Sequence, residues 1–237
     1  MADPEIEALT FDVFGTVVDW RNGIAKEAET ILAAEGHHVD GQAFALAWRA
    51  RYQPSMEEVR ARRRPFVRLD VLHRENLLDV FREFEIDGVS DDTTDRLNRA
   101  WHRLPAWPDV TKGLARLKRR FIIAPLSNGN VSLMVNLAKH EGLGWDVILG
   151  AEIAEAYKPE PEAYRRAAAL LDLHPSRCLM VAAHNSDLVA AAATGMKTAF
   201  VPRIDEYGAH QKADFAAEHD FDIIADDFED LAHKLGV

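Results

Sequence analysis

Residues 6–20 read IEALTFDVFGTVVDW, and the first half of this stretch is typical of a buried β-strand. The apolar run is short and continuous, as expected for a strand that is covered on both faces of a sheet. Asp12 stands where the run ends, and Gly15 and Thr16 follow it in a loop. Phe14 adds an apolar ring two residues after the acid. The stretch therefore predicts a carboxylate at the carboxyl end of a strand.

Five further apolar runs of this kind alternate with helical patterns along the chain. Such alternation predicts the α/β class, with a doubly wound parallel sheet. The predicted strands lie within residues 121–128, 145–151, 178–183, 198–202 and 222–227. The predicted helices cover residues 109–119, 131–141, 160–171 and 186–194.

The stretch from residue 20 to residue 103 departs from this alternation. It contains no convincing strand and predicts four or five helices, two of them over residues 40–53 and 91–103. An all-helical block after the first strand is expected to form a cap, which closes over a site and expels water. We therefore predict an α/β core of residues 1–19 and 104–237, with a helical cap of residues 20–103.

The composition fits a globular protein and restricts its partners. With 48% hydrophobic and 28% charged residues, the chain of 237 residues is balanced like a soluble protein. Its net charge of −11 argues against nucleic acid as a partner, and no apolar stretch is long enough to span a membrane. The acidic start MADPEIEALTF does not resemble a signal peptide. The single cysteine, Cys178, excludes an internal disulfide, so we expect a cytoplasmic protein.

One basic segment, VRARRRPFVR at residues 59–68, contrasts with the acidic average. Most such segments are solvated helix faces. A second interpretation is that one or two of these arginines attract an anionic substrate. The sequence leaves both open.

Polar residues stand at the ends of four predicted strands or in the loops that follow them. Because ligands bind at the carboxyl ends of parallel strands, these side chains are expected to converge on one site. A carboxylate, a lysine and a hydroxyl–amide pair there are typical of nucleophilic catalysis, with Asp12 attacking and Lys158 keeping it ionised. The residues in question are Asp12, Thr16, Ser127, Asn128, Lys158, His184, Asn185 and Asp187.

The same segments carry a family resemblance over the whole chain. FDVFGTVVD, LSNGN, YKPEPEAY and VAAHNSD resemble, in order, the four motifs of the haloacid dehalogenase superfamily. Most members of that superfamily are phosphatases with an Asp-x-Asp first motif and a bound Mg²⁺. Here Phe14 stands where the second acid belongs, and the fourth motif lacks the usual Gly-Asp start. Mg²⁺ requires oxygen ligands, so these departures disfavour a phosphatase.

The chain resembles most the metal-free L-2-haloacid dehalogenase branch of that superfamily. AWRARY supplies the Trp48-Arg49 pair of this branch, whose arginine receives halide, and Tyr164 matches another site position. The resemblance implies no metal and no cofactor. It also implies a homodimer, because members of the branch often dimerise, although nothing here locates an interface.

We accordingly expect hydrolysis of short 2-haloacids to 2-hydroxy acids. Asp12 would displace halide from C2 to give an ester, and water would hydrolyse the ester with Asp187 or His184 as base. Arg49 and Asn128 would receive the halide, and backbone amides near Thr16 and Ser127 would hold the substrate carboxylate. Phe14, Tyr164 and Asn185 complete the predicted binding residues. The alternatives are a phosphatase with an unusual acid and a catalytically silent member that binds a metabolite or partner.

His184 departs from the branch, which usually has asparagine at this position. One interpretation is a buried, hydrogen-bonded histidine at a strand end. The other is a site residue that faces the halide or the attacking water. An inward ring would reduce the space for halide, so we also expect a bias toward small haloacetates, with fluoroacetate among the candidate substrates.

Overall fold

The computed structural model describes residues 5–237. Residues 1–4, which include the acidic start of the predicted core, lie outside the described range. In the described part, six parallel strands form one sheet in the order β3-β2-β1-β4-β5-β6. This is the strand order of a doubly wound sheet, and it confirms the predicted fold class. The strands are β1 (Ala8–Phe11), β2 (Ile122–Ser127), β3 (Leu149–Gly150), β4 (Cys178–Ala182), β5 (Lys197–Phe200) and β6 (Ile223–Ile224).

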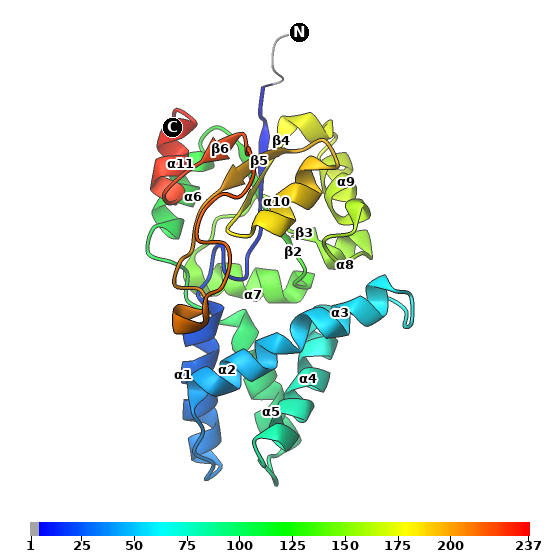
Figure 1. Cartoon of the computed structure of the whole chain (residues 1–237), viewed down its shortest axis with the longest axis vertical. Coiled ribbons are helices and arrows are strands. Elements are labelled where there is room, and N and C mark those ends of the chain that lie inside the picture. Colours follow the sequence, from blue (N-terminus) through cyan, green and yellow to red (C-terminus); the bar gives the residue numbers. More distant parts are fainter. Residues whose placement is uncertain (1–4) are drawn as a thin grey trace.

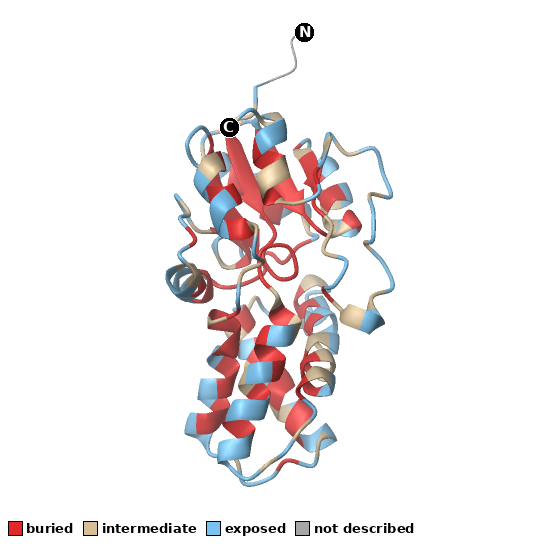
Figure 2. Cartoon of the chain, turned by 90° about the vertical axis from the view of Figure 1, so that its left-hand side faces the viewer, coloured by how far each residue is buried: buried red, intermediate tan, exposed pale blue. Residues whose placement is uncertain are grey.

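Helices cover both faces of the sheet, as Figure 1 shows. Leu9 and Phe11 of β1 face one apolar cluster, while Ala8 and Met180 face a second one on the opposite side. The first cluster packs against α6 (Val110–Leu117), α7 (Val131–Glu141) and α11 (Phe228–Lys234). The second packs against α9 (Pro161–Leu170) and α10 (Asn185–Ala192), while α8 (Ala151–Ala154) follows β3. Figure 2 shows the sheet as the most continuously buried part of the molecule, as the apolar runs predict.

The helices between β1 and α6 lie together beyond the carboxyl edge of the sheet (Figure 1). They are α1 (Trp20–Ala34), α2 (Gly41–Ala50), α3 (Tyr52–Arg60), α4 (Leu69–Glu83), α5 (Asp91–Asn98) and the short 3₁₀ helix η1 (Arg99–His102). The side chains of Asp19, Asp40 and Ser90 accept hydrogen bonds at the first turns of α1, α2 and α5. This grouping supports our proposed division into a core of residues 1–19 and 104–237 and a cap of residues 20–103.

The predicted helix over residues 40–53 is wrong as one element, because the structure divides it at Arg51. Pro54 explains the break. A continuous helix would need a hydrogen bond from residue 54 to the carbonyl of Ala50, and proline has no N–H to donate. In the observed arrangement Pro54 stands in the first turn of α3, where a backbone N–H has no partner within the helix.

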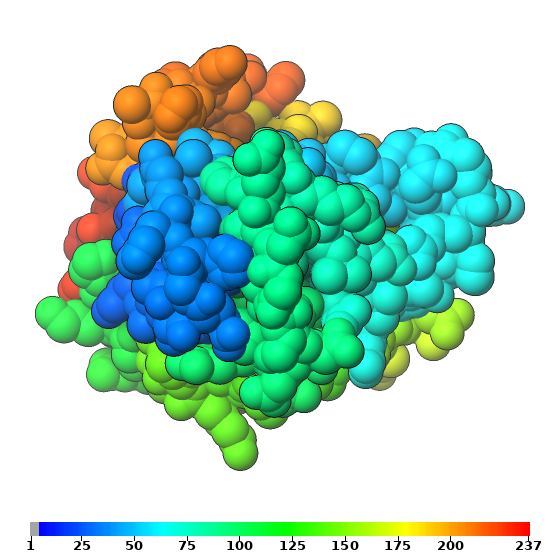
Figure 3. Space-filling view, turned by 90° about the horizontal axis from the view of Figure 1, so that it is seen from below, coloured from blue at the N-terminus to red at the C-terminus, as the bar shows by residue number. Residues whose placement is uncertain are grey.

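A long loop, residues 201–222, connects β5 to β6 and contains the 3₁₀ helix η3 (Gly208–His210). Arg21 of α1 binds it from the cap side, donating to the carbonyls of Glu206 at 3.0 Å and Asp205 at 3.2 Å. In the view from below, this loop (orange) lies beside α1 (blue) (Figure 3). The loop thereby brings residues from late in the chain to the junction between core and cap.

Candidate active site

The turn after β1 places Asp12 at the junction of sheet and cap. The Asp12 N–H still donates to the carbonyl of Val181 in β4 at 3.0 Å, so the residue continues the strand pairing. The hydroxyl of Thr16 donates to Asp12 Oδ2 at 2.8 Å and accepts from the N–H of Ala183 at 2.9 Å. Asp12 is therefore held by two strands and a hydroxyl, while 11% of its side chain stays exposed toward a cavity.

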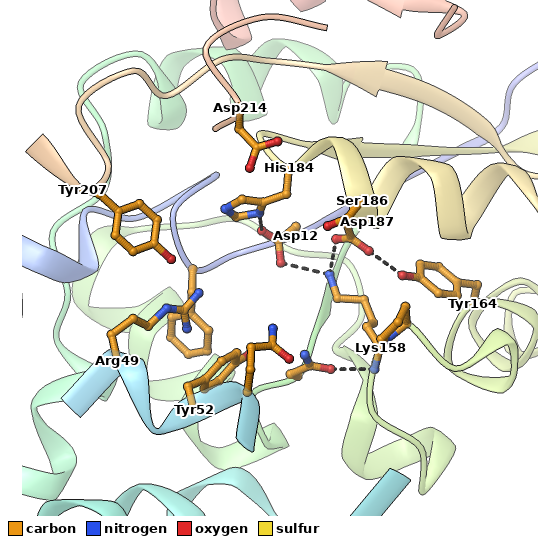
Figure 4. A pocket seen from close by; sticks show the side chains of 14 residues that line it. Asp12, Arg49, Tyr52, Lys158, Tyr164, His184, Ser186, Asp187, Tyr207 and Asp214 are labelled. Atoms are coloured by element: carbon orange, nitrogen blue, oxygen red, sulfur yellow. Dashed lines mark hydrogen bonds and ion pairs between the residues drawn. The ribbon is translucent and has the colours of Figure 1, made fainter. Parts of the chain in front are cut away.

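Lys158 lies between two carboxylates (Figure 4). Its Nζ is 2.9 Å from Asp12 Oδ1 and 2.5 Å from Asp187 Oδ2. Asn128 orients the lysine by accepting its backbone N–H at 2.8 Å. Tyr164 donates its hydroxyl to the other oxygen of Asp187 at 2.5 Å. Both oxygens of Asp187 are thus engaged, and the ammonium group is shared with Asp12.

His184 also lies between two carboxylates. Its Nδ1 is 3.1 Å from Asp12 Oδ2, and its Nε2 is 2.8 Å from Glu206 Oε2. Glu206 belongs to the loop of residues 201–222 and is 1% exposed. Its second oxygen accepts a hydrogen bond from the indole N–H of Trp20 at 2.7 Å. The ring of His184 therefore connects the predicted nucleophile to a buried acid that the sequence motifs do not include.

These contacts determine the charges in the site. Burial alone would raise the pKa of Asp12, but the Lys158 ammonium and the His184 ring outweigh it and hold this pKa well below its usual range. Burial would lower the pKa of His184, yet Glu206 and Asp12 raise it well above the ordinary value. The pKa of Lys158 is likewise raised, because its two carboxylate partners outweigh burial. In this state Asp12 is an ionised carboxylate beside two cations.

Arg49 of α2 faces the same cavity from the cap side. Its guanidinium lies 4.1 Å from the ring centre of Tyr52 and 5.2 Å from that of Trp20. Its Nη1 is buried and hydrogen-bonds to no group within residues 5–237. Tyrosine and glutamate neighbours outweigh burial and raise the pKa of Arg49, so it stays charged. Arg49 therefore brings a permanent positive charge to the wall of the cavity.

The cavity has a volume of about 190 Å³ and lies between the carboxyl edge of the sheet and the cap. Three predicted site residues do not line it, namely Thr16, Ser127 and Asn185. Thr16 hydrogen-bonds to Asp12 from a position outside the cavity. The Ser127 hydroxyl accepts a hydrogen bond from the N–H of Gly129 at 3.0 Å. The side chain of Asn185 instead binds Asp214 and the carbonyl of Ala216 in the long loop. The predicted residues that do line the cavity are Asp12, Phe14, Arg49, Asn128, Lys158, Tyr164, His184 and Asp187.

Several lining residues were not among those predicted. Tyr52 and Gln53 come from α3, and Tyr207 and Asp214 come from the long loop (Figure 4). Tyr52 ends the AWRARY segment that contains Arg49, whereas Gln53, Tyr207 and Asp214 belong to no strand end or recognisable motif. Only the short spacing from Arg49 to Tyr52, one helical turn, points to a shared face. Pro159 and Ser186, the remaining lining residues, adjoin predicted positions.

The donor set does not fit a Mg²⁺ ion. Phe14 presents a phenyl ring to the cavity where a second acid would supply an oxygen ligand. The ammonium group of Lys158 already binds both Asp12 and Asp187. Residues 5–237 contain no group of three or more His, Cys, Asp or Glu side chains arranged to hold a metal ion.

Comparison with known proteins identifies the family of the chain. A model of the haloacid dehalogenase-like hydrolases matches residues 6–195. The chain belongs to this family. Among solved structures, the defluorinating L-2-haloacid dehalogenase Rha0230 superposes with a TM-score of 0.96 at 50% identity, covering 98% of this chain and 96% of that one.

Two curated dehalogenases are also similar to this chain over most of its length, at lower identity. An (S)-2-haloacid dehalogenase of Pseudomonas sp. (strain CBS-3) is 30% identical over 211 residues, which are 86% of this chain and 87% of that protein. Haloacetate dehalogenase H-2 of Moraxella sp. (strain B) is 24% identical over 218 residues, 89% and 93% of the two chains. The likeness to all three spans cap and core alike.

Proposed function

We propose that this hydrolase removes halide from short 2-haloacids and releases 2-hydroxy acids through an ester on Asp12. The observation that carries the proposal is the environment of Asp12. Its carboxylate is held ionised by Lys158 and faces a cavity lined by the ring of Phe14 and the cation of Arg49. An ionised carboxylate in a partly apolar cavity is suited to attack a saturated carbon.

The first step is displacement of halide from C2 by a carboxylate oxygen of Asp12. The new C–O bond forms as the C–halogen bond breaks, which inverts the configuration at C2. Lys158 keeps the nucleophile deprotonated and oriented, and Thr16 fixes its second oxygen. Water then hydrolyses the ester at its carbonyl carbon and regenerates the Asp12 carboxylate.

The leaving halide needs positive charge and hydrogen-bond donors. Arg49 supports this role, because its buried Nη1 has no partner within residues 5–237 and its charge is permanent. Asn128 lines the same cavity and has an amide group to donate. We therefore propose Arg49 and Asn128 as the halide-binding residues.

We include fluoroacetate among the substrates. The cavity of about 190 Å³ is small, and the solved relative with 50% identity is described as defluorinating. Curated relatives described as haloacetate and (S)-2-haloacid dehalogenases support short acids, with the S configuration where C2 is chiral. A small cavity keeps a donor close to fluoride, the halide that gains most from hydrogen bonding as charge develops.

The alternative functions have less support. A Mg²⁺-dependent phosphatase would need oxygen ligands around Asp12, and the phenyl ring of Phe14 supplies none. A catalytically silent binding protein would have no need of an aspartate whose pKa is held this low by a buried lysine and histidine.

The test is free halide measured with and without a chelator. The substrate panel is fluoroacetate, chloroacetate and both enantiomers of 2-chloropropionate. We expect halide release that a chelator leaves unchanged, and (S)-2-chloropropionate to react in preference to its enantiomer. Phosphate release from a phosphate ester only with added Mg²⁺ would support the phosphatase instead. Neither activity would favour the binding protein.

The location and partners of the protein form part of this proposal. No helix of residues 5–237 is long and apolar enough to cross a membrane. The one cysteine, Cys178, is a buried free thiol, and the net charge is −11. These features support a cytoplasmic protein whose partner is a small haloacid and not nucleic acid. A homodimer stays a prediction, which measurement of the molar mass in solution tests.

A further inference from the structure

The two acceptors that face the ring of His184 match a doubly protonated imidazole. A neutral imidazole has one N–H and one lone pair, so it can donate to only one of two acceptors. Here both ring nitrogens face carboxylate oxygens, Asp12 at 3.1 Å and Glu206 at 2.8 Å. The arrangement is favourable only if the ring is an imidazolium between two anions.

Formation of the ester removes one of these anions. Once Asp12 is alkylated, Nδ1 faces a neutral ester, and Glu206 alone stabilises the charge on the ring. The pKa of His184 must then fall, because a partner that raises it has lost its charge. The ring can release a proton at this stage and present a lone pair at Nδ1, beside the group that water has to attack.

Asp187 is less suited to take a proton from that water. One of its oxygens is 2.5 Å from the ammonium of Lys158, and the other accepts the hydroxyl of Tyr164 at 2.5 Å. Both oxygens of Asp187 are therefore already used to bind Lys158 and Tyr164. The contact between Asp187 and the Lys158 ammonium is suited to holding the lysine in place.

We propose that His184, held by Glu206, is the general base for hydrolysis of the Asp12 ester. The proposal rests on the proposed function, since it concerns the second half of that reaction. Glu206 acts through His184 and is a positioning residue. It fixes the ring through Nε2 and is itself fixed by the indole N–H of Trp20 at 2.7 Å.

Ester hydrolysis begins with loss of a proton from His184. After halide has left, His184 releases its Nδ1 proton to solvent, and this proton and the halide ion together make up the hydrogen halide produced. The oxygen of water bonds to Cγ of Asp12, and Nδ1 takes one of its protons. The Cγ–O bond to the substrate then breaks, and the departing oxygen takes this proton to become a 2-hydroxy acid. The carboxyl group left at Asp12 returns its own proton to Nδ1, which restores the imidazolium.

Other charged groups around the cavity do not replace Glu206 in this role. Arg49 and Lys158 are cations, so they lower the pKa of a nearby imidazolium and favour proton release. The acids Asp187 and Asp214 also line the cavity, but within residues 5–237 only Asp12 and Glu206 hydrogen-bond to the ring of His184. Tyr52 and Tyr164 also line the cavity, and burial raises the pKa of both phenols, which keeps them neutral.

The test separates the two half-reactions with chloroacetate. Rapid mixing and acid quench give the halide released per chain, and intact mass gives the fraction of protein that carries a carboxymethyl group on Asp12. We expect His184→Asn to release about one chloride per chain and then to accumulate the ester, with hydrolysis slowed at least about 100-fold, the usual contribution of a general base. His219→Asn, the same change at an exposed site, should behave like the wild type.

Three results would contradict the assignment. The first is hydrolysis of the ester by His184→Asn near the wild-type rate. The second is loss of the initial chloride release in that variant. The third is accumulation of the ester in Asp187→Asn but not in His184→Asn. A wild-type enzyme that releases no chloride from chloroacetate would instead refute the proposed function itself. The two failures are therefore distinguishable.

Glu206→Gln supplies a second, independent measurement. An amide at this position keeps the contact to Nε2 but removes the charge that raises the pKa of His184. The rate of ester hydrolysis should then reach its plateau at a lower pH than in the wild type, and the plateau should be lower because the base is weaker. An unchanged pH profile of ester hydrolysis would show that Glu206 has only a structural role and would overturn the pairing.

Discussion

The carboxylate of Glu206 occupies the space that a side chain at Gly15 would fill. A Cβ at Gly15 would lie 2.2 Å from Oε1 of Glu206 and 2.4 Å from its Cδ. Gly15 also has a φ of +91°, in the region that other residues rarely adopt. The turn that follows Asp12 therefore packs directly against Glu206, although the two segments are far apart in the sequence.

Gly15→Ala should therefore displace Glu206 and release His184. We expect ester hydrolysis to slow by about tenfold or more, while halide release per chain persists, because Asp12 keeps Lys158. The backbone strain should also destabilise the fold by about 1–3 kcal/mol. Gly36→Ala is the matched control, since Gly36 has a φ of +86° and no described atom lies within 4 Å of its Cβ position. A control variant with the same loss of hydrolysis would attribute the effect to strain alone.

Asp12→Asn should abolish turnover and leave the fold intact, because an amide cannot form the ester. For the wild type, a single turnover in ¹⁸O-water checks the same point. The label should enter the Asp12 carboxylate, because water attacks the ester carbonyl and the product keeps the original aspartate oxygen. Mass spectrometry of the peptide that contains Asp12 measures it. Label found only in the hydroxy acid would indicate direct attack by water on the substrate.

The elements of the core could be predicted because β1 to β5 are short apolar runs that are mostly buried, and only the edge strand β6 is partly exposed. The rule that parallel strands present their carboxyl ends at one edge then brought Asp12, Asn128, Lys158 and Asp187 together, and the structure places all four around one cavity. The rule concerns regular elements only. It does not apply to the cap, where Pro54 divides the helix predicted over residues 40–53 because proline has no N–H to donate.

Glu206 could not be predicted from the sequence for a related reason. It stands in an irregular loop, residues 201–222, which Arg21, Trp20 and His184 hold at the site. No periodicity marks such a residue, and its neighbours Asp205 and Tyr207 are equally polar in sequence. Likewise the sequence placed His184 at a strand end but could not tell which groups its two nitrogens face. That depends on the path of a loop 22 residues away in the chain.

The stability of the fold should depend on pH through His184. Its pKa is raised in the folded state, so its contribution is fully present below the unfolded value of 6.5 and is lost as pH rises toward the folded value. The difference in the free energy of unfolding between wild type and His184→Asn should therefore shrink above pH 6.5, by at most about 1.4 kcal/mol per pH unit. Urea denaturation between pH 6 and pH 9 measures it. A difference that grows with pH would mean that the folded ring is neutral.

The carboxyl groups of Asp12 and Glu206 give the stability of the fold a pH dependence opposite in sign to that of His184. The pKa values of Asp12 and Glu206 are lowered, so their stabilisation is present above the ordinary carboxyl range and is lost as the pH falls through it. Glu206→Gln should therefore flatten the decline of stability on the acid side of about pH 4.5, measured by the same urea titrations. If the free energy of unfolding of Glu206→Gln declines as steeply with falling pH as that of the wild type, other carboxyl groups account for the decline.

Arg49→Lys tests the proposed halide site without removing its charge. Lysine lacks the planar group that packs on the ring of Tyr52 at 4.1 Å and can offer two parallel donors to an anion. We expect kcat/KM for chloroacetate to fall at least about tenfold, the effect of one lost charge-assisted hydrogen bond, and for fluoroacetate to fall further. Arg51→Lys, the same change outside the cavity, should stay within about twofold of the wild type because nothing in the site contacts it. Equal kinetics for the wild type, Arg49→Lys and Arg49→Ala would remove Arg49 from the halide site.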